Sequence, residues 1–190
     1  MGDATDWNLP KQKPPPKNAG IALSAIGAIL MIASIFSHAW IVPRMAGESG
    51  GISLLSTHVD GESMSNFAIV DEWQKKMEGF DDPMRPSSAW PIAGLFTLIL
   101  SLVGGVGAAA TAALTWREKR PATPIMASTV ALLGSMGALI AGFVFVMTKP
   151  QFGGLRIGWA FWAFGLGSVG ALIGAQFLAK LIQPIDPDLV

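Results

Sequence analysis

The chain has 190 residues, of which 51% are hydrophobic and only 14% are charged, whereas soluble proteins usually carry about 25% charged residues. The formal net charge is zero, so electrostatics favour neither a nucleic-acid partner nor an anionic surface partner. Because the chain contains no cysteine, disulfides, thiolate metal sites and cysteine nucleophiles are excluded.

Residues 1–18 are polar and include three consecutive prolines at positions 14–16. They predict a flexible or polyproline-like tail. The apolar stretch that follows has the small-x-small pattern Ser37-His38-Ala39 near its end, which a cleaved signal peptide would also show. That stretch is longer than the usual apolar region of about 7–15 residues, so we predict a retained helix.

Four stretches with almost no charge predict four transmembrane helices, at about residues 19–42, 89–116, 121–148 and 157–180. Each exceeds the roughly 20 apolar residues that cross a hydrocarbon core of about 30 Å. A soluble all-helical protein is the alternative, but its helices would typically have about 10–14 residues. The predicted fold class is therefore all-α: an integral membrane four-helix bundle over residues 19–182, with a long extracytoplasmic loop at 43–88 and a short tail at 183–190.

Within the long loop, residues 65–78 predict an amphipathic helix. Asp71 with Lys75 and Glu72 with Lys76 are favourable i,i+4 pairs on its wet face. The apolar side chains recur every three or four residues: Phe67, Val70, Trp73, Met77 and Phe80. One interpretation is a helix that lies on the bundle or membrane surface. The other makes these five residues the candidate surface for a partner protein.

The distribution of charge predicts the orientation. A tight basic turn at residues 117–120 joins the second and third spans, whereas the long loop is rich in acidic residues. Because short cytoplasmic loops carry an excess of Lys and Arg, both termini are predicted to be cytoplasmic. The expected location is the plasma (inner) membrane, as a multi-pass protein.

Tryptophans near the predicted helix ends are expected to anchor the protein at the membrane–water interfaces, where the ring is apolar and the N–H stays hydrated. These predicted anchors are Trp40, Trp90, Trp116, Trp159 and Trp162.

Small residues recur at four-residue spacing in the second, third and fourth spans, and they let helix backbones approach closely in lipid. The main interpretation is packing within the bundle, and a seam for a second copy or a partner is the alternative. The predicted packing residues are Gly104, Ala108, Gly134, Ala138, Gly142, Gly167, Gly170, Ala171 and Gly174.

The sequence gives little support for a catalytic, transport or cofactor-binding function. The spans contain no Asp, Glu or Arg, and Lys180 lies only at the end of the fourth. This argues against a pump or a coupled transporter. The G-x-G-x-x-G pattern at 165–170 lies inside an apolar span without a preceding strand, so it is rejected as a nucleotide motif. His38, the one titratable residue within a span, is interpreted as an interfacial histidine. No catalytic, cofactor-binding or metal-binding residue is predicted.

The predicted layout has four spans, a long first outer loop and a short second outer loop. Several short sequence patterns fit the same layout. Trp40 lies at the end of the first span, and residues 51–54 (Gly-Ile-Ser-Leu) lie where a Gly-Leu-Trp motif would fall. Residues 154–160 enter the fourth span with a Gly, Leu and Trp pattern, and Arg85 precedes the second span. In these features the chain resembles the claudin and peripheral-myelin-protein superfamily of tetraspan proteins.

That resemblance implies a structural or adhesive membrane protein, or an accessory subunit that modulates a partner. The chain lacks the Trp of the Gly-Leu-Trp motif and the two loop cysteines of the family. Without that disulfide, the resemblance leaves open whether loop 43–88 folds as the family's sheet.

The sequence therefore predicts a non-enzymatic multi-pass protein that acts through protein–protein contacts, most simply as a subunit of a larger membrane complex. The expected partners are the lipid bilayer and either other membrane-protein subunits or further copies of this chain, with no nucleic acid. The alternative is a small oligomeric channel or transporter with a backbone-lined path.

Overall fold

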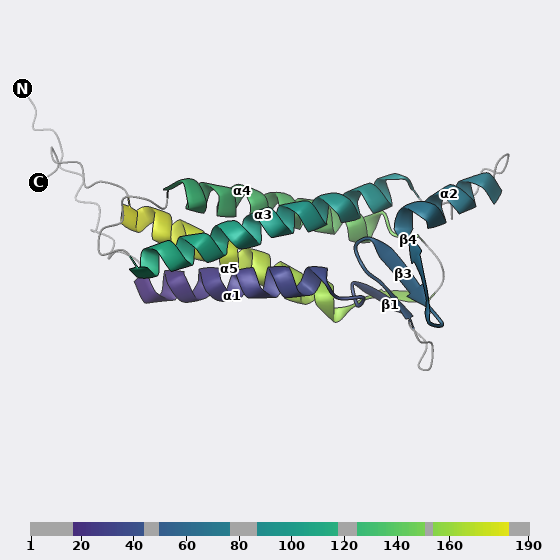
Figure 1. Ribbon diagram of the computed structural model, residues 1–190, viewed down its shortest axis with the longest axis horizontal. Coiled ribbons are helices and arrows are strands. Elements are labelled where there is room, and N and C mark those ends of the chain that lie inside the picture. The colour runs from purple at the N-terminus through teal and green to yellow at the C-terminus, as the bar shows by residue number, and fades with distance from the viewer. Residues whose placement is uncertain (1–16, 44–49, 77–86, 118–124, 151–153, 183–190) are drawn as a thin grey trace, which may run out of the picture.

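The computed structural model describes residues 17–43, 50–76, 87–117, 125–150 and 154–182. Four long helices form an elongated bundle, and a small sheet lies at one end of it (Figure 1). The bundle helices are α1 (Lys17–Ile35), α3 (Ala89–Arg117), α4 (Ile125–Met147) and α5 (Trp159–Ile182). Within the described residues, these four are long and apolar enough to cross a membrane, which confirms this part of the predicted fold class.

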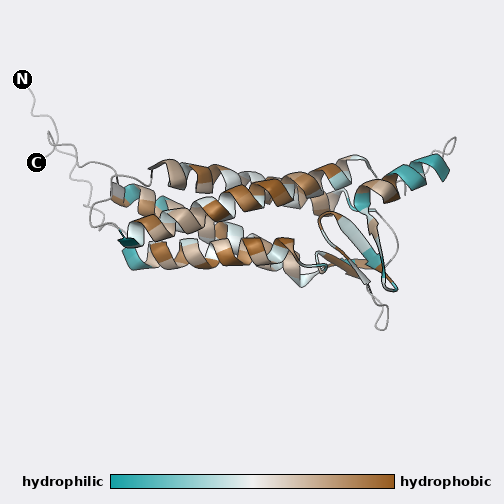
Figure 2. Cartoon of the chain, in the orientation of Figure 1, coloured by the Kyte–Doolittle hydropathy of each residue, from teal (hydrophilic) through white to brown (hydrophobic). Residues whose placement is uncertain are grey.

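The bundle is held by close helix contacts. α1 packs mainly against α5 and α3 against α4, and contacts of α1 with α3 and of α4 with α5 complete the bundle. Figure 2 shows hydrophobic residues along all four helices. α3 and α4 meet at Gly104 and Gly134, where a Cβ added to Gly134 would lie 2.5 Å from the backbone nitrogen of Gly104. Such small residues allow the backbone contact that drives helix association in lipid.

Two predicted spans differ from the observed helices at their outer ends. α1 ends at Ile35, and the end of the predicted span 19–42 is strand β1 (Ile41–Pro43). The span predicted at 157–180 begins with the last residue of strand β5 (Leu155–Ile157), and α5 starts at Trp159. A buried apolar strand and a helix end carry the same uncharged sequence, so composition alone does not separate them.

The prediction of an all-α fold is wrong in one respect, because the structure contains a five-stranded antiparallel sheet. Residues 43–88 do not form only a loop with one helix. Their described part contributes β2 (Gly50–Ile52), β3 (Ser56–Val59), β4 (Glu62–Ser65) and helix α2 (Asn66–Lys76). The strand order β4-β3-β2-β1-β5 places the connection that follows α1 beside the one that precedes α5. We call these five strands and α2 the sheet layer.

A tight hairpin and a buried amide shape the sheet layer. Asp60 and Gly61 form a two-residue turn between β3 and β4, with φ of 50° and 85°. Two consecutive positive φ values are what a type I′ hairpin requires. Asn66 is fully buried at the start of α2, where its Nδ2 donates to the carbonyls of Ser53 at 3.1 Å and Leu54 at 3.2 Å. These contacts tie the start of α2 to the segment between β2 and β3.

The sheet layer is anchored to the bundle through the segment after α1. The backbone N–H of Trp40 donates to the carbonyl of Ile52 at 3.2 Å, and the N–H of Gly158 donates to the carbonyl of Trp40 at 2.8 Å. Gly94 in α3 contributes a second close contact, because a Cβ at this position would collide with the carbonyl oxygen of Leu54. The sheet therefore packs on the ends of the helices.

Candidate functional site

One face of the sheet is apolar. Pairing in register aligns one residue from each strand across this face: Met64, Thr57, Ile52, Ile41 and Ile157. Successive side chains of a strand point to opposite faces, so a register set by these pairs collects apolar groups on one side.

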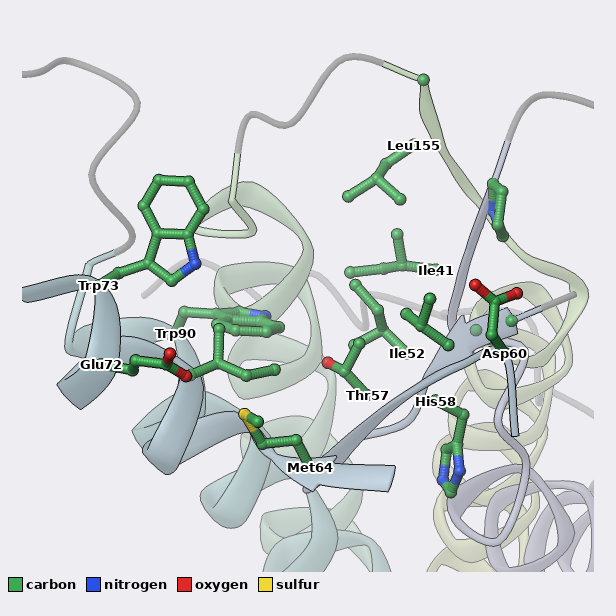
Figure 3. A pocket seen from close by; sticks show the side chains of 16 residues that line it. Ile41, Ile52, Thr57, His58, Asp60, Met64, Glu72, Trp73, Trp90 and Leu155 are labelled. Atoms are coloured by element: carbon green, nitrogen blue, oxygen red, sulfur yellow. The ribbon is translucent and has the colours of Figure 1, made fainter. Parts of the chain in front are cut away.

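This apolar face lines a cavity of about 510 Å³, a size within the range of about 300–1,000 Å³ that ligand pockets occupy. Figure 3 shows Ile41, Ile52 and Leu155 on one side of the cavity, with Trp73 of α2 across from them. Trp90, at the start of α3, also lines it. The cavity is thus bounded by the sheet, α2 and the first turn of a bundle helix.

Trp90 carries a polar group that is buried and unpaired. Its side chain is 1% exposed, and its ring stacks on Phe145 with centroids 5.9 Å apart. In the described part of the chain, no acceptor lies within hydrogen-bond distance of its indole Nε1. Burying an N–H without an acceptor costs about 1–3 kcal/mol, so the stacking and burial of the ring must offset this cost.

The charged residues that line the cavity are acidic. Among the described residues that line the cavity, Asp60 and Glu72 are acidic, His58 is titratable, and none is Lys or Arg. On α2, Lys76 pairs with Glu72 at 2.6 Å, so this acidic lining residue is already ion-paired, and Lys75 pairs with Asp71 at 2.7 Å. The hydrogen bond to Asp71 and its negative charge raise the pKa of Lys75, so the ammonium side of this exposed pair is present at neutral pH and is lost as the pH rises through that raised pKa.

The sheet layer also exposes large apolar side chains. Leu55 is 37% exposed, Val59 56%, Met64 46% and Phe67 43%. Apolar exposure on the bundle helices is expected for surfaces in lipid, but these four residues lie outside the four candidate spans. We refer to them as the exposed apolar set. Exposed apolar side chains of this kind commonly mark surfaces that contact another molecule.

The only two histidines of the chain lie close together, and one of them, His58, also lines the cavity. The ring of His38 lies 3.9 Å from that of His58, centroid to centroid, in an edge-on arrangement. The Nε2 of His58 is 3.1 Å from the hydroxyl of Ser56. His38 was interpreted as an interfacial residue of the first span, but it follows the end of α1 and lies in the connection between α1 and β1.

The residues predicted as a partner surface do not form one free stripe. Val70 is buried, Phe67 is exposed, and Trp73 lines the cavity. Met77 and Phe80 lie outside the described residues. The periodicity of the sequence predicted that this helix is amphipathic. It did not reveal that the apolar side of α2 packs on the sheet and on α3 of the same chain.

Two of the five predicted interfacial anchors are wrong. Trp40 and Trp90 lie in the protein core, because the sheet layer covers the helix ends near them. The Nε1 of Trp40 donates to the carbonyl of Ser34 at 2.8 Å and not to water. Trp116, Trp159 and Trp162 are exposed near helix ends, as interfacial anchors would be.

The predicted packing glycines lie at helix contacts within the chain. Gly167 faces Gly27 and Met31 of α1, Gly174 faces Ser24 of α1, and Gly142 faces Phe164 of α5. Ala108, Ala138 and Ala171 are fully buried. Gly170 makes ordinary contacts with α1, and Gly104 meets Gly134 as described above.

The sheet, the cavity and the burial of Trp90 were not predicted from the sequence. A signal for the hairpin was present, since Asp60-Gly61 lies between segments that contain β-branched or apolar residues. The cavity had no local signal, because its walls come from segments far apart in the chain. Comparison of the chain with protein-family models and with curated proteins gave no match in either case.

Proposed function

We propose that this chain is a non-enzymatic, claudin-like tetraspan membrane protein that acts through protein–protein contacts, as a structural or accessory subunit of a larger membrane complex. In this proposal the protein lies in the plasma (inner) membrane. Both termini are on the cytoplasmic side, and the sheet layer is on the opposite side of the membrane. The sheet formed by both connections on that side supports the resemblance, since the family's first outer loop is expected to contain a sheet.

The observation that carries this proposal is the exposed apolar set on the sheet layer. Outside the hydrocarbon core, exposed Leu, Val, Met and Phe side chains would contact water unless a partner covers them. They are also held on a rigid support, because the sheet is hydrogen-bonded to the start of α5 and packed on α3. Rigid apolar surfaces lose little entropy on binding, which suits a permanent contact between subunits.

The interior of the bundle favours a scaffold over a channel. Buried hydroxyls of α3 donate to carbonyls of their own helix: Thr97 to Ala93 at 2.7 Å, and Thr111 to Gly107 at 2.8 Å. Hydroxyls used in this way satisfy the helix locally and do not line a path for a solute. This favours the subunit role over the channel alternative.

Affinity capture tests the proposal. The protein, extracted from its own membrane in a mild detergent, should bring down a stoichiometric membrane-protein partner or a second copy of itself. Phe67→Asp should reduce this capture, because it places a charge at an apolar contact. The expected loss is about 1–2 kcal/mol, or roughly five- to thirtyfold in affinity.

Phe67→Leu is the matched control, because it keeps an apolar side chain at the same position and should retain capture. An acidic residue in the first turn of α2 suits the helix dipole, so Phe67→Asp should leave the monomer folded. Capture that is equal for both variants, or recovery of the chain without any partner, would contradict the proposed function.

A further inference from the structure

A groove runs between two bundle helices, α1 and α3, both of which are long and apolar enough to cross a membrane. Its volume is about 600 Å³, and its described lining consists of Ile, Ala and Trp side chains. We call it the α1–α3 groove. At the depth of a membrane span, such a groove is exposed to lipid and not to water, so it requires an apolar occupant.

The α1–α3 groove is closed at one end and open at the other. The two helices meet at Ile32 and Gly105, where a Cβ added to Gly105 would lie 2.9 Å from Cγ1 of Ile32. The groove residues on α3 all follow this contact, from Ala109 to Trp116. The groove therefore opens toward the end of the bundle where α1 begins and α3 ends (Figure 1).

The dimensions of the groove suit one hydrocarbon chain. From Ile21 to Ala33 its lining on α1 extends over about 18 Å, at a rise of about 1.5 Å per residue. This length is close to the depth of one leaflet, roughly 15 Å, which is half of a hydrocarbon core of about 30 Å. The mean cross-section of the groove is then about 33 Å², whereas a helix with a diameter of about 10 Å occupies about 80 Å². A helix could therefore lie only over the mouth of the groove.

Polar groups at the open end match the remaining parts of a phospholipid. The ring of Trp116 lines the groove and is 74% exposed. At the membrane interface an exposed indole N–H can donate to a lipid ester carbonyl. Arg117 follows as the last residue of α3 and is exposed. A guanidinium group binds phosphate through charge-assisted hydrogen bonds.

The charge at this end of the bundle complements a phosphate. Among the described residues of the helix ends there, the charged ones are Lys17, Arg117 and Lys180, and all three are exposed. The adjoining segments 1–16, 118–124 and 183–190 lie outside the described residues and carry both signs in the sequence. With these segments included, this end has seven basic and five acidic residues. Its net charge is therefore positive, as in protein regions that bind lipid head groups.

We propose that the α1–α3 groove binds one phospholipid of the surrounding bilayer. One acyl chain lies along Ala25, Ala28 and Ala113, an ester carbonyl accepts a hydrogen bond from Nε1 of Trp116, and the phosphate pairs with Arg117. The groove opens at the end of the bundle away from the sheet layer (Figure 1), so this binding does not depend on a protein partner at the exposed apolar set. The bound lipid fills the space between α1 and α3 and stabilises the folded bundle by mass action.

Native mass spectrometry tests the contact with the acyl chain. The protein is purified in a mild detergent, stripped of lipid and titrated with dioleoyl phosphatidylglycerol, and a first lipid should bind more tightly than further copies. Ala113→Phe places a ring in the groove and should weaken this first binding by about tenfold. Val106→Phe is the matched control, because Val106 is 60% exposed on the same helix and does not line the groove. It should bind as wild type.

The contact with phosphate is tested by a second lipid, dioleoylglycerol, which has the same two chains and no phosphate. Arg117→Gln should weaken binding of the phospholipid by roughly three- to tenfold and leave binding of dioleoylglycerol unchanged. Lys180→Gln should change neither. Lys180 lies two residues after Leu178, which faces Gly20 of α1, so its side chain projects from the opposite side of α5.

Ala25→Leu fills the groove from α1 and keeps the test informative if Ala113→Phe does not fold. Equal first binding to wild type and to these filled variants would overturn the proposal, as would phospholipid binding that Arg117→Gln leaves unchanged. The same spectra report the oligomeric state. A dimer that Ala113→Phe converts to a monomer would show that a second copy of the chain covers the groove, and the proposal would fail.

Discussion

Replacing Gly167 with valine should destabilise the folded bundle, whereas replacing Gly165 in the same helix should not. A Cβ at position 167 would lie 2.8 Å from the backbone nitrogen of Met31 and 2.9 Å from the carbonyl oxygen of Gly27. Because both are backbone atoms, no change of rotamer relieves the clash, and α1 must move away from α5. Overpacking of this kind costs about 1–3 kcal/mol, and occasionally more.

Gly165 provides the control, since nothing lies within 4 Å of a Cβ built on it. Gly165→Val should match wild type or exceed it slightly, because glycine is about 1 kcal/mol less favourable than alanine inside a helix. Thermal unfolding in detergent, followed by circular dichroism, measures both variants. Equal melting temperatures for the two variants would show that α1 and α5 do not cross at Gly167.

Trp40→Ala should produce the second large loss of stability. The ring is fully buried between the end of α1, the sheet, α4 and α5. It contacts Phe164 with centroids 5.0 Å apart and Phe145 at 6.0 Å. Removal of a buried Trp costs about 3–5 kcal/mol, and here it also leaves the Ser34 carbonyl without its indole donor.

Removal of the Trp40 indole should detach the sheet layer from the bundle before the helices separate. Limited proteolysis of Trp40→Ala should therefore cleave within residues 50–76 while the helical circular dichroism is retained. Trp162→Ala, at an exposed aromatic residue, should behave as wild type in both measurements. If Trp40→Ala is as resistant as Trp162→Ala, the indole is not the element that joins the sheet to the bundle.

The four spans could be predicted from the sequence because their requirement is local. A segment that crosses lipid must satisfy its backbone polar groups within itself, which produces a long uncharged helix. α3 agrees with the predicted range to within one residue, from Ala89 to Arg117. The two i,i+4 ion pairs of α2 could be predicted for the same reason, because each joins residues one helical turn apart. Both pairs form in the structure.

The sheet could not be predicted in the same way, because its pairing is not local. β1 pairs with β5, which lies two bundle helices later in the chain. Ile41 and Ile157 read as helix ends because their neighbours are uncharged. The burial of Trp40 and Trp90 follows from that missing layer, since proximity to a helix end does not reveal what covers the end.

Only part of the candidate site could be predicted from the sequence, for the same reason. Phe67 and Trp73 were identified from the periodicity of α2, but Ile41, Leu155 and Trp90 reach the cavity only through tertiary contacts. The unpaired N–H of Trp90 has no sequence signature. The exposed apolar set was likewise hidden, because a short strand such as β4 carries too few residues to show an alternating pattern.

The central claim, that a partner covers the exposed apolar set, is tested most directly by cysteine protection. The chain contains no cysteine, so Phe67→Cys introduces a single thiol. A membrane-impermeant maleimide should label it poorly on intact cells and readily on the protein purified in strong detergent. Lys75→Cys, at an exposed position of α2, should be labelled in both states. Equal, efficient labelling of Phe67→Cys in both states would contradict the claim.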